Sequence, residues 1–261
     1  MLVIGERING MFRDVRRAIQ RKDKEVVRDL ARRQVEAGAQ ALDVNVGTAS
    51  DEPVEAMLWL MEAIQEAVDA RLCIDSAKEV VFEPALEACK GRPIINSTTG
   101  AQEKLDFFLP LAQKYDAELI ALTIDEAGVP STTEARVEIA MRILVAAMEQ
   151  GLSPDALYID PVVLPVSALQ DQPACVLEAI GQFRQLASPP PHVVVGLSNI
   201  SQNTTRRPLI NRTMLVMAIA HGLDAAVMDP LDTELMDAMI TAELLLNKHL
   251  YCDSFLEAYR K

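Results

Sequence analysis

The chain has 261 residues, of which 50% are hydrophobic and 24% charged, a composition typical of globular proteins. Acidic residues outnumber basic ones by 38 to 25, a formal net charge of −13. This balance argues against nucleic acid as a partner, because binding to phosphate backbones needs surplus Lys and Arg. No basic leader opens the chain and no uncharged stretch reaches membrane length, so a cytoplasmic protein without membrane contact is expected.

Short apolar runs alternate with longer segments of helical period, which is typical of β/α units around a parallel sheet. Eight strands are predicted, at 2–5, 41–46, 72–75, 93–96, 119–124, 157–160, 193–197 and 225–228. Helices are predicted at 22–37, 52–69, 78–88, 101–114, 132–150, 167–187, 208–221 and 232–247. Gly38, Gly151 and Gly222 each follow a helical segment, as expected of residues that end helices in the left-handed conformation.

Two further patterns mark boundaries, and both agree with one continuous domain. The run 131–134, Ser-Thr-Thr-Glu, has the spacing of a capping box, and 188–191, Ser-Pro-Pro-Pro, predicts a stiff surface turn. A doubly wound fold would carry a Gly-x-Gly-x-x-Gly turn after the first strand, which residues 5–10 do not supply. Eight successive units therefore predict a single (β/α)8 TIM barrel over residues 1–261.

In such a barrel the active site forms at the C-terminal ends of the strands. Polar residues stand at nearly every predicted strand end: Glu6, Arg7, Asn9, Asp43, Asn45, Asp75, Ser76, Asn96, Ser97, Thr98, Thr123, Asp125, Asp160, Ser198, Asn199 and Asp229. The three histidines fall elsewhere, and Cys73, Cys89, Cys175 and Cys252 form no Cys-x-x-Cys pair. Hydrolase triads, zinc sites and iron–sulfur clusters are therefore not expected in this chain.

Asp75, Asn96 and Asp160 are the strongest candidates for ligand contacts, because each ends an apolar run. The alternative for any one of them is a helix cap. Carboxylates accept hydrogen bonds and carboxamides both accept and donate, which suits a flat heterocycle with an amino group and ring N–H donors, such as the edge of a pterin. Phosphate fits less well, because residues 196–203 are rich in amides and hydroxyls rather than glycines.

Several motifs carry a family resemblance that covers almost the whole chain. They are Ile4-Gly5-Glu6-Arg7-Ile8-Asn9-Gly10-Met11, Ala41-Leu42-Asp43-Val44-Asn45-Val46-Gly47, Ile95-Asn96-Ser97-Thr98, Leu157-Tyr158-Ile159-Asp160-Pro161, and 196–202 continuing into 207–213. With them, the chain resembles the pterin-binding methyltransferase family, and within it the methyltetrahydrofolate:corrinoid/iron–sulfur protein methyltransferases of the reductive acetyl-CoA pathway.

The first two motifs are shared with the folate-binding modules of cobalamin-dependent methionine synthase. The strand-seven motif and the segment 251–255 favour a standalone enzyme, because eight units leave no room for a cobalamin module. Dihydropteroate synthase would carry Ser-Arg-Lys at the end of strand seven and a Ser-Thr-Arg-Pro loop, and neither is present.

The resemblance implies transfer of a methyl group from methyltetrahydrofolate to cobalt(I) of a corrinoid carried by a separate corrinoid iron–sulfur protein, with no metal held by this chain. It places the catalytic role on Asn199 and the folate contacts on Asp75, Asn96, Asp160, Gly196, Ser198, Gln202 and Arg207. Without it, Arg207 is a solvated arginine at a helix start. Met11 and Phe12 are assigned to the core and left out of the site, the alternative being that they cover the aromatic portion of the folate. A homodimer is expected. The alternatives are an enzyme serving a different corrinoid protein and a noncatalytic folate-binding barrel.

Overall fold

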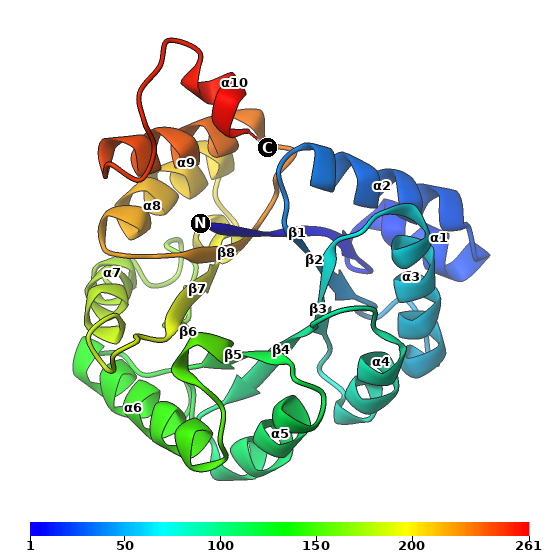
Figure 1. Cartoon of the computed structure of the whole chain (residues 1–261), viewed down its shortest axis with the longest axis horizontal. Helices are drawn as coiled ribbons and strands as arrows, with labels where there is room; N and C mark the ends of the chain where they lie inside the picture. Colours follow the sequence, from blue (N-terminus) through cyan, green and yellow to red (C-terminus); the bar gives the residue numbers. More distant parts are fainter. Residues whose placement is uncertain (261) are drawn as a thin grey trace.

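A computed structural model of the chain describes residues 1–260. Its centre is a closed barrel in which all eight strands are parallel and follow one another in chain order. The strands are β1 (Leu2–Asn9), β2 (Ala41–Asn45), β3 (Arg71–Asp75), β4 (Ile94–Thr99), β5 (Glu118–Leu122), β6 (Leu157–Asp160), β7 (His192–Gly196) and β8 (Ala225–Met228). The predicted TIM barrel is confirmed, with the helices forming a ring outside the strands (Figure 1).

The helices agree with the predicted segments with two additions. They are α1 (Arg13–Arg21), α2 (Lys24–Glu36), α3 (Pro53–Ala67), α4 (Phe82–Ala88), α5 (Gln102–Lys114), α6 (Thr133–Glu149), α7 (Gln172–Phe183), α8 (Arg207–Ala220), α9 (Thr233–Leu245) and α10 (Phe255–Tyr259). The additions are α1 and α10. The first turns into α2 where Lys22 adopts a left-handed conformation and the Asp23 side chain accepts a hydrogen bond from the backbone of Glu25.

Two other boundaries differ from the sequence prediction. Thr132, rather than Ser131, caps α6, because its hydroxyl accepts from the backbone N–H of Ala135 at 3.2 Å. The helix predicted at 167–187 is shorter, since α7 begins at Gln172 and residues 161–171 form an irregular segment after β6. The glycines predicted to end helices are confirmed, with φ values of 104°, 85° and 105° at Gly38, Gly151 and Gly222.

Two strands extend beyond their predicted ends because their register is interrupted. The pairing of β1 with β2 shifts between Gly5 and Ile8, and the pairing of β4 with β5 shifts between Asn96 and Thr98. Such irregularities re-aim side chains that would otherwise alternate between the two faces of a strand. Their consequence appears at the C-terminal end of the barrel, where neighbouring residues of one strand face the same cavity.

The interior of the barrel is filled by one apolar cluster to which every strand contributes a residue: Ile4, Ala41, Cys73, Ile94, Ile120, Tyr158, Val194 and Ala225. A larger cluster fills the layer between the strands and the helices. Because Ile120 and Val194 also line the cavity above, the inner cluster forms its floor. The polar site therefore stands on a packed base.

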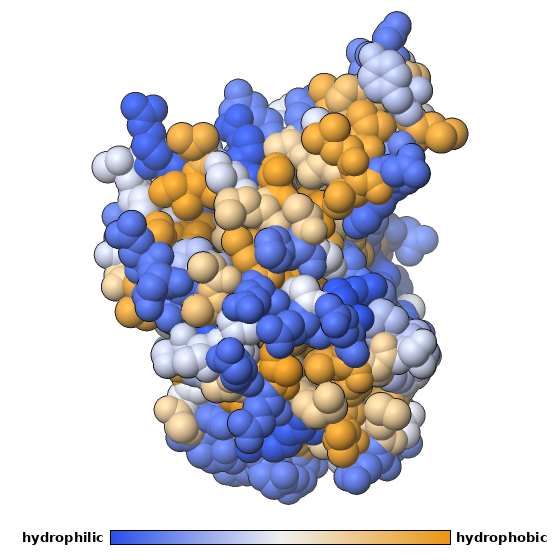
Figure 2. Space-filling view, turned by 90° about the vertical axis from the view of Figure 1, so that its left-hand side faces the viewer, coloured by the Kyte–Doolittle hydropathy of each residue, from blue (hydrophilic) through white to orange (hydrophobic). Residues whose placement is uncertain are grey.

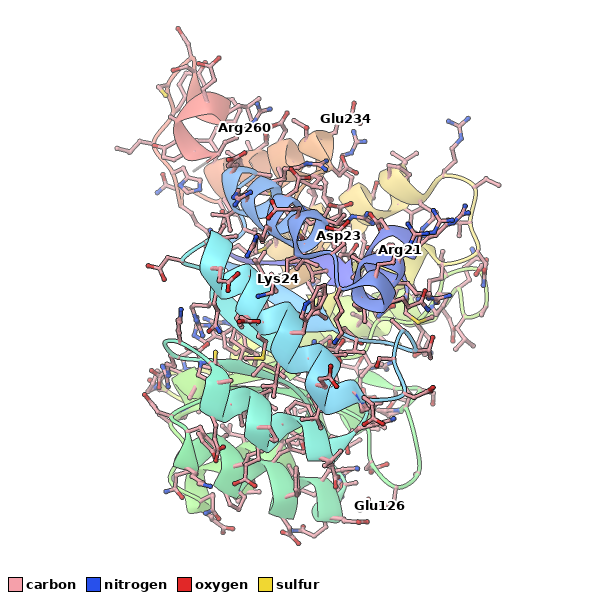
Figure 3. The ribbon with its side chains drawn as sticks, turned by 90° about the vertical axis from the view of Figure 1, so that its right-hand side faces the viewer. Arg21, Asp23, Lys24, Glu126, Glu234 and Arg260 are labelled. Carbon is pink, nitrogen blue, oxygen red and sulfur yellow. The ribbon has the colours of Figure 1, made fainter. Side chains whose placement is uncertain are left out.

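Ion pairs and the C-terminal segment occupy the opposite end of the barrel. Glu118, the first residue of β5, pairs with Arg71 and Arg92, and Asp224, just before β8, pairs with Arg184 and His192. Arg260 lies against Gly38, which precedes β2. In the side view of Figure 3, Arg260 lies far from Glu126, which belongs to the loop after β5. No residue of the segment 251–255 lines the cavity at the strand ends that carry the polar residues.

Within residues 1–260, no helix is long and apolar enough to cross a membrane. The helical face shown in Figure 2 carries a patch of hydrophobic residues. Between α7 and α8 this face holds an apolar groove of about 350 Å³, lined by Val166, Pro173, Leu177, Ile200, Leu209, Ile210, Thr213, Met214 and Met217.

Candidate active site

A cavity of about 640 Å³ opens at the C-terminal ends of the strands. All eight residues predicted for the site line it: Asp75, Asn96, Asp160, Gly196, Ser198, Asn199, Gln202 and Arg207. All eight strands contribute at least one lining residue, and the start of α8 supplies the remainder of one wall. Residues spread over more than 130 positions of the chain are therefore brought to one pocket.

On the side formed by β2, β3 and β4, carboxylates and carboxamides form cross-strand pairs. The Asn96 amide donates to Oδ1 of Asp43 at 2.9 Å, and the Asn45 amide donates to Oδ2 of Asp75. Oδ1 of Asn45 in turn accepts from the backbone N–H of Gly47. Each amide is thereby held in one orientation, and the Asn96 oxygen is left free to accept from a ligand.

Burial raises the pKa values of both acids in this group. It is the main cause at Asp75, whose pKa is raised to about 6 although the hydrogen bond from Asn45 acts in the other direction. Asp43 is 3% exposed, and its pKa lies well above the ordinary range because of burial and the adjacent Asp75 carboxylate. Two acids so close in a buried site do not ionise independently. Their charge state will therefore respond to a ligand that donates hydrogen bonds.

Asp160, at the end of β6, is the most isolated acid of the cavity. It is 8% exposed, and its Oδ1 accepts from the backbone N–H of Val162 at 2.7 Å. Burial raises its pKa to about 7, while the N–H groups of Val162 and Gly196 lower it. A carboxylate in this environment gains strongly from a ligand with two adjacent N–H donors, because such donors favour its charged form.

Glu6 closes the wall between β1 and β7. Its carboxylate accepts from the hydroxyl of Ser198 at 2.6 Å. Burial, reinforced by the Asp229 carboxylate, raises its pKa to about 7, against the effects of Ser198, Arg207 and Arg7. The register shift in β1 turns both Glu6 and Arg7 towards the cavity.

Asn199 belongs to a short 3₁₀ helix (Leu197–Ser201) directly after β7. Its side chain is exposed at the cavity, and its Oδ1 accepts from Nε2 of Gln202 at 2.8 Å. Arg207 donates through Nε to the hydroxyl of Ser201 at 3.1 Å and through Nη2 to the Ser198 carbonyl oxygen. The arginine thus braces the helix, while the Asn199 carboxamide is held only by a single exposed neighbour.

Several lining residues lie outside the predicted site set. Glu6, Arg7, Asn9, Asp43 and Asp229 had been recognised as strand-end residues but not as parts of the site. Phe12, which the sequence assigned to the core, lines the cavity, and the Arg7 guanidinium lies 4.1 Å from the centre of its ring. Met11 is 61% exposed and lines a neighbouring pocket. The sequence signal for Phe12 was its place three residues after Asn9, which ends a strand.

None of the three histidines lines the cavity. In the part of the chain that the structure describes, no three His, Cys, Asp or Glu residues are grouped so as to hold a metal ion. The groups available for chemistry in this cavity are carboxyls, carboxamides, hydroxyls and two arginines. These groups bind and orient a ligand through hydrogen bonds, and they can hold or release protons near neutral pH.

Comparison with known proteins identifies the family. Residues 9–229 match the sequence profile described as "Pterin binding enzyme". The chain belongs to the pterin-binding enzyme family. Solved structures agree at the level of the fold. Dihydropteroate synthase from Yersinia pestis with a sulfonamide drug and that from Coxiella burnetii with pteroic acid each superpose with a TM-score of 0.72 and 16% identity, over 95% of this chain and 94% of theirs.

Two curated relatives of this pterin-binding enzyme are more similar in sequence. A methylcorrinoid:tetrahydrofolate methyltransferase from Eubacterium limosum is 36% identical over 263 residues, covering 100% of this chain and 97% of the relative. Methionine synthase from Mycobacterium tuberculosis is 30% identical over 239 residues, covering 87% of this chain but 20% of that protein. The full-length relationship to the first confirms the prediction that the chain is an enzyme, a methyltransferase.

Proposed function

We propose that this chain moves a methyl group between N5 of tetrahydrofolate and the cobalt of a corrinoid bound to a separate protein, in the direction from methyltetrahydrofolate to cobalt(I). The observation that carries the proposal is the convergence of Asp75, Asn96 and Asp160 in one cavity. The name of the Eubacterium limosum relative contains the same two methyl carriers, a corrinoid and tetrahydrofolate.

The three residues would hold the pterin by its polar edge. Asp160 would accept from the exocyclic amino group and the adjacent ring N–H, because its second oxygen is free of the Val162 bond. The free oxygens of Asp75 and Asn96 would accept from donors on the neighbouring ring positions. Gly196 and Ser198 would border the ring, and Gln202 and Arg207 would contact the remainder of the folate.

Asn199 would act at N5 itself. During transfer to cobalt, the C–N5 bond breaks as the methyl carbon bonds to the cobalt electron pair, so N5 must be hydrogen-bonded or protonated to leave. The Asn199 carboxamide has no titratable proton, and its contribution would be a hydrogen bond that strengthens as charge on N5 changes. The proton itself would come from solvent or from an acid of the cavity such as Glu6, whose pKa is about 7.

A second candidate is the reverse transfer, from methylcobalt to tetrahydrofolate, which the name of the Eubacterium limosum relative favours. The lone pair of N5 would then attack the methyl carbon, and cobalt(I) would leave with the bonding electrons. One site serves both directions, since forward and reverse reactions share a transition state. For the partner that carries the corrinoid, we propose the corrinoid iron–sulfur protein of the reductive acetyl-CoA pathway. The alternative partner is a different corrinoid protein.

Stopped-flow mixing tests the function directly. The protein is mixed with methyltetrahydrofolate and cobalt(I) cobalamin, and the absorbance of methylcobalamin is followed; the reverse arm starts from methylcobalamin and tetrahydrofolate. We expect acceleration over buffer in at least one arm. A protein that binds tetrahydrofolate yet accelerates neither arm would be a noncatalytic folate-binding barrel, and the proposed function would be wrong.

We further propose a homodimer and a cytoplasmic location. The exposed side chains of Leu209 and Met217, which lie 59% and 46% exposed along the groove of α8, support the first. Light scattering coupled to size exclusion measures the mass. A monomeric mass at micromolar concentration would contradict the dimer, and a dimer that persists unchanged in Leu209→Asp would contradict this groove as its interface.

A further inference from the structure

Val162, the second residue after the end of β6, has an unusual backbone conformation. Asp160 is followed by Pro161 and then by Val162, whose φ is 65°. The left-handed region is unfavourable for side chains branched at Cβ, and Val adopts it only where its surroundings impose it. In this conformation the Val162 N–H points back to Oδ1 of Asp160 at 2.7 Å. The strained residue therefore directly orients the buried carboxylate.

A buried arginine lies on the other side of the same loop. Arg136 of α6 is 0% exposed. Its Nε donates to the Pro161 carbonyl oxygen at 2.8 Å, its Nη2 to Oε1 of Gln172 at 2.8 Å, and its Nη1 to the Thr132 carbonyl oxygen at 3.2 Å. No ion pair of Arg136 occurs among residues 1–260. All three acceptors are uncharged, so burial of this charge is costly.

The acceptors of Arg136 are themselves fixed. Gln172, 4% exposed, donates through Nε2 to the Ser131 carbonyl oxygen, so its Oε1 is oriented towards the guanidinium. Thr132 caps the helix that carries Arg136. A planar guanidinium reaches three acceptors in fixed directions, which an ammonium group on a flexible stem does not. The result is a rigid clamp on the carbonyl that lies between Asp160 and Val162.

We propose that Arg136 is a positioning residue for the pterin site: by holding the Pro161 carbonyl, it keeps Val162 in the left-handed conformation, and the Val162 N–H then orients Asp160 with one oxygen open to the ligand. This inference rests on the proposed function, in which Asp160 contacts the pterin. It assigns a role to a residue that lies outside the cavity, since Arg136 lines no part of it.

The loop has a second pair of attachments that extends the effect. The Val166 N–H donates to the Ile200 carbonyl oxygen at 3.0 Å, and the Ser167 hydroxyl donates to the Gln202 carbonyl oxygen at 2.8 Å. Residues 161–171 therefore link the Asp160 side of the cavity to the 3₁₀ helix of Asn199. The clamp of Arg136 holds the first end of this link and the two hydrogen bonds hold the other.

The test measures the affinity for tetrahydrofolate by calorimetry in four variants of the full chain. Arg136→Gln should weaken binding by about tenfold, as expected for a lost hydrogen bond that orients a charged group. Val162→Gly alone should bind like the wild type, because glycine adopts the left-handed conformation without cost. The double variant should recover most of the lost affinity. Arg142→Gln, on the exposed side of the same helix, is the matched control and should change nothing.

The rescue separates positioning from simple packing. If Arg136 only stabilised the α6–α7 contact, glycine at 162 would not restore affinity, so equal weakness of the single and double variants overturns the inference. Wild-type affinity in Arg136→Gln also overturns it. Should that variant not fold, Arg136→Lys keeps the positive charge but loses the planar guanidinium that reaches three acceptors, and unchanged binding there overturns the inference as well. Failure of the wild type itself to bind tetrahydrofolate would instead refute the proposed function.

Discussion

The two sides of the cavity are built in different ways. On the side of β2, β3, β4 and β6, acids that are nearly or partly buried are fixed by cross-strand amides or backbone N–H groups, as at Asp43 and Asp160. On the side of β7, Asn199 and Gln202 are exposed and contact mainly each other. A site that holds one part of a ligand in place while charge changes at another part needs both fixed hydrogen-bonding groups and a group that can reorient. Under the proposed function, the rigid strand ends would bind the pterin, and the short exposed helix would carry the side chain that adjusts its hydrogen bond during transfer.

Replacing Asn199 tests the adjustable side and should have the largest effect. Asn199→Ala should slow methyl transfer by on the order of 100-fold, as for loss of a group that hydrogen-bonds the transition state. Affinity for tetrahydrofolate should change by only about threefold, because the fixed acids are untouched. Single-turnover stopped flow and calorimetry measure the two quantities. An equal loss in both would erase the distinction between the two sides.

Replacing Asp160 tests the fixed side. Asp160→Asn keeps the shape but removes the charge, so affinity should fall roughly 10- to 100-fold, corresponding to a hydrogen bond with a charged group. The rate at saturating folate should change less than the affinity. Asp125→Asn, at a half-buried carboxylate in the loop after β5 that pairs with Arg142 and does not line the cavity, is the control and should bind normally. Normal affinity in Asp160→Asn would remove this acid from the proposed contacts.

Lower pH should weaken binding while it stabilises the unliganded protein. The pKa of Asp160 is about 7 in the folded state against an ordinary value of 3.8, so the folded chain holds the extra proton between these values. The contribution of Asp160 to stability should therefore fall as pH rises through this window, by about 1 kcal/mol per unit near its upper end, and Glu6 and Asp75 act in the same direction. A ligand that needs the carboxylate shows the reverse trend, with affinity lost by up to about tenfold per unit below pH 7. Thermal melts and calorimetry at pH 6 and 8 measure the two quantities. If stability and ligand affinity changed in the same direction between these pH values, Asp160 would not be the acid that binds the ligand as a carboxylate.

The contact between Gln202 and Asn199 should have the smallest effect. Gln202→Ala removes one exposed hydrogen bond of 2.8 Å, so transfer should slow by only about threefold. Gln185→Ala changes an exposed glutamine that follows α7, outside the cavity, and serves as the control; transfer should keep its wild-type rate. If Gln202→Ala slowed transfer as much as Asn199→Ala, the two amides would act as one rigid unit, and Asn199 would not be the adjustable group of the cavity.

Most of the barrel could be predicted from alternation of apolar runs and helical segments, because each β/α unit carries its own periodic signal. What escaped prediction depends on single residues. The break between α1 and α2 rests on one left-handed residue, Lys22, and the length of β1 rests on a register shift after Gly5. Neither leaves a periodic trace, since both are local departures from regular geometry.

In the site, too, residues with a signal in the local sequence could be predicted, and residues that depend on distant partners could not. Asp75, Asn96 and Asp160 could be found because polar residues end apolar runs, and all three face the cavity. Asp43 was recognised at a strand end but was not included in the site, because its partner in the cavity, Asn96, is two strands away. Arg136 could not be found at all. Its role depends on a backbone conformation 26 residues further along the chain, at Val162.

The two ends of the barrel also differ in which substitutions they can accept during evolution. The pairs of Glu118 and Asp224 stand beneath the apolar floor, at the end away from the cavity. Substitutions that strengthen or weaken that end can accumulate without touching the ligand contacts, while the loops above can change to meet a new partner. A lineage with this layout can exchange the protein it serves and keep the molecule it binds.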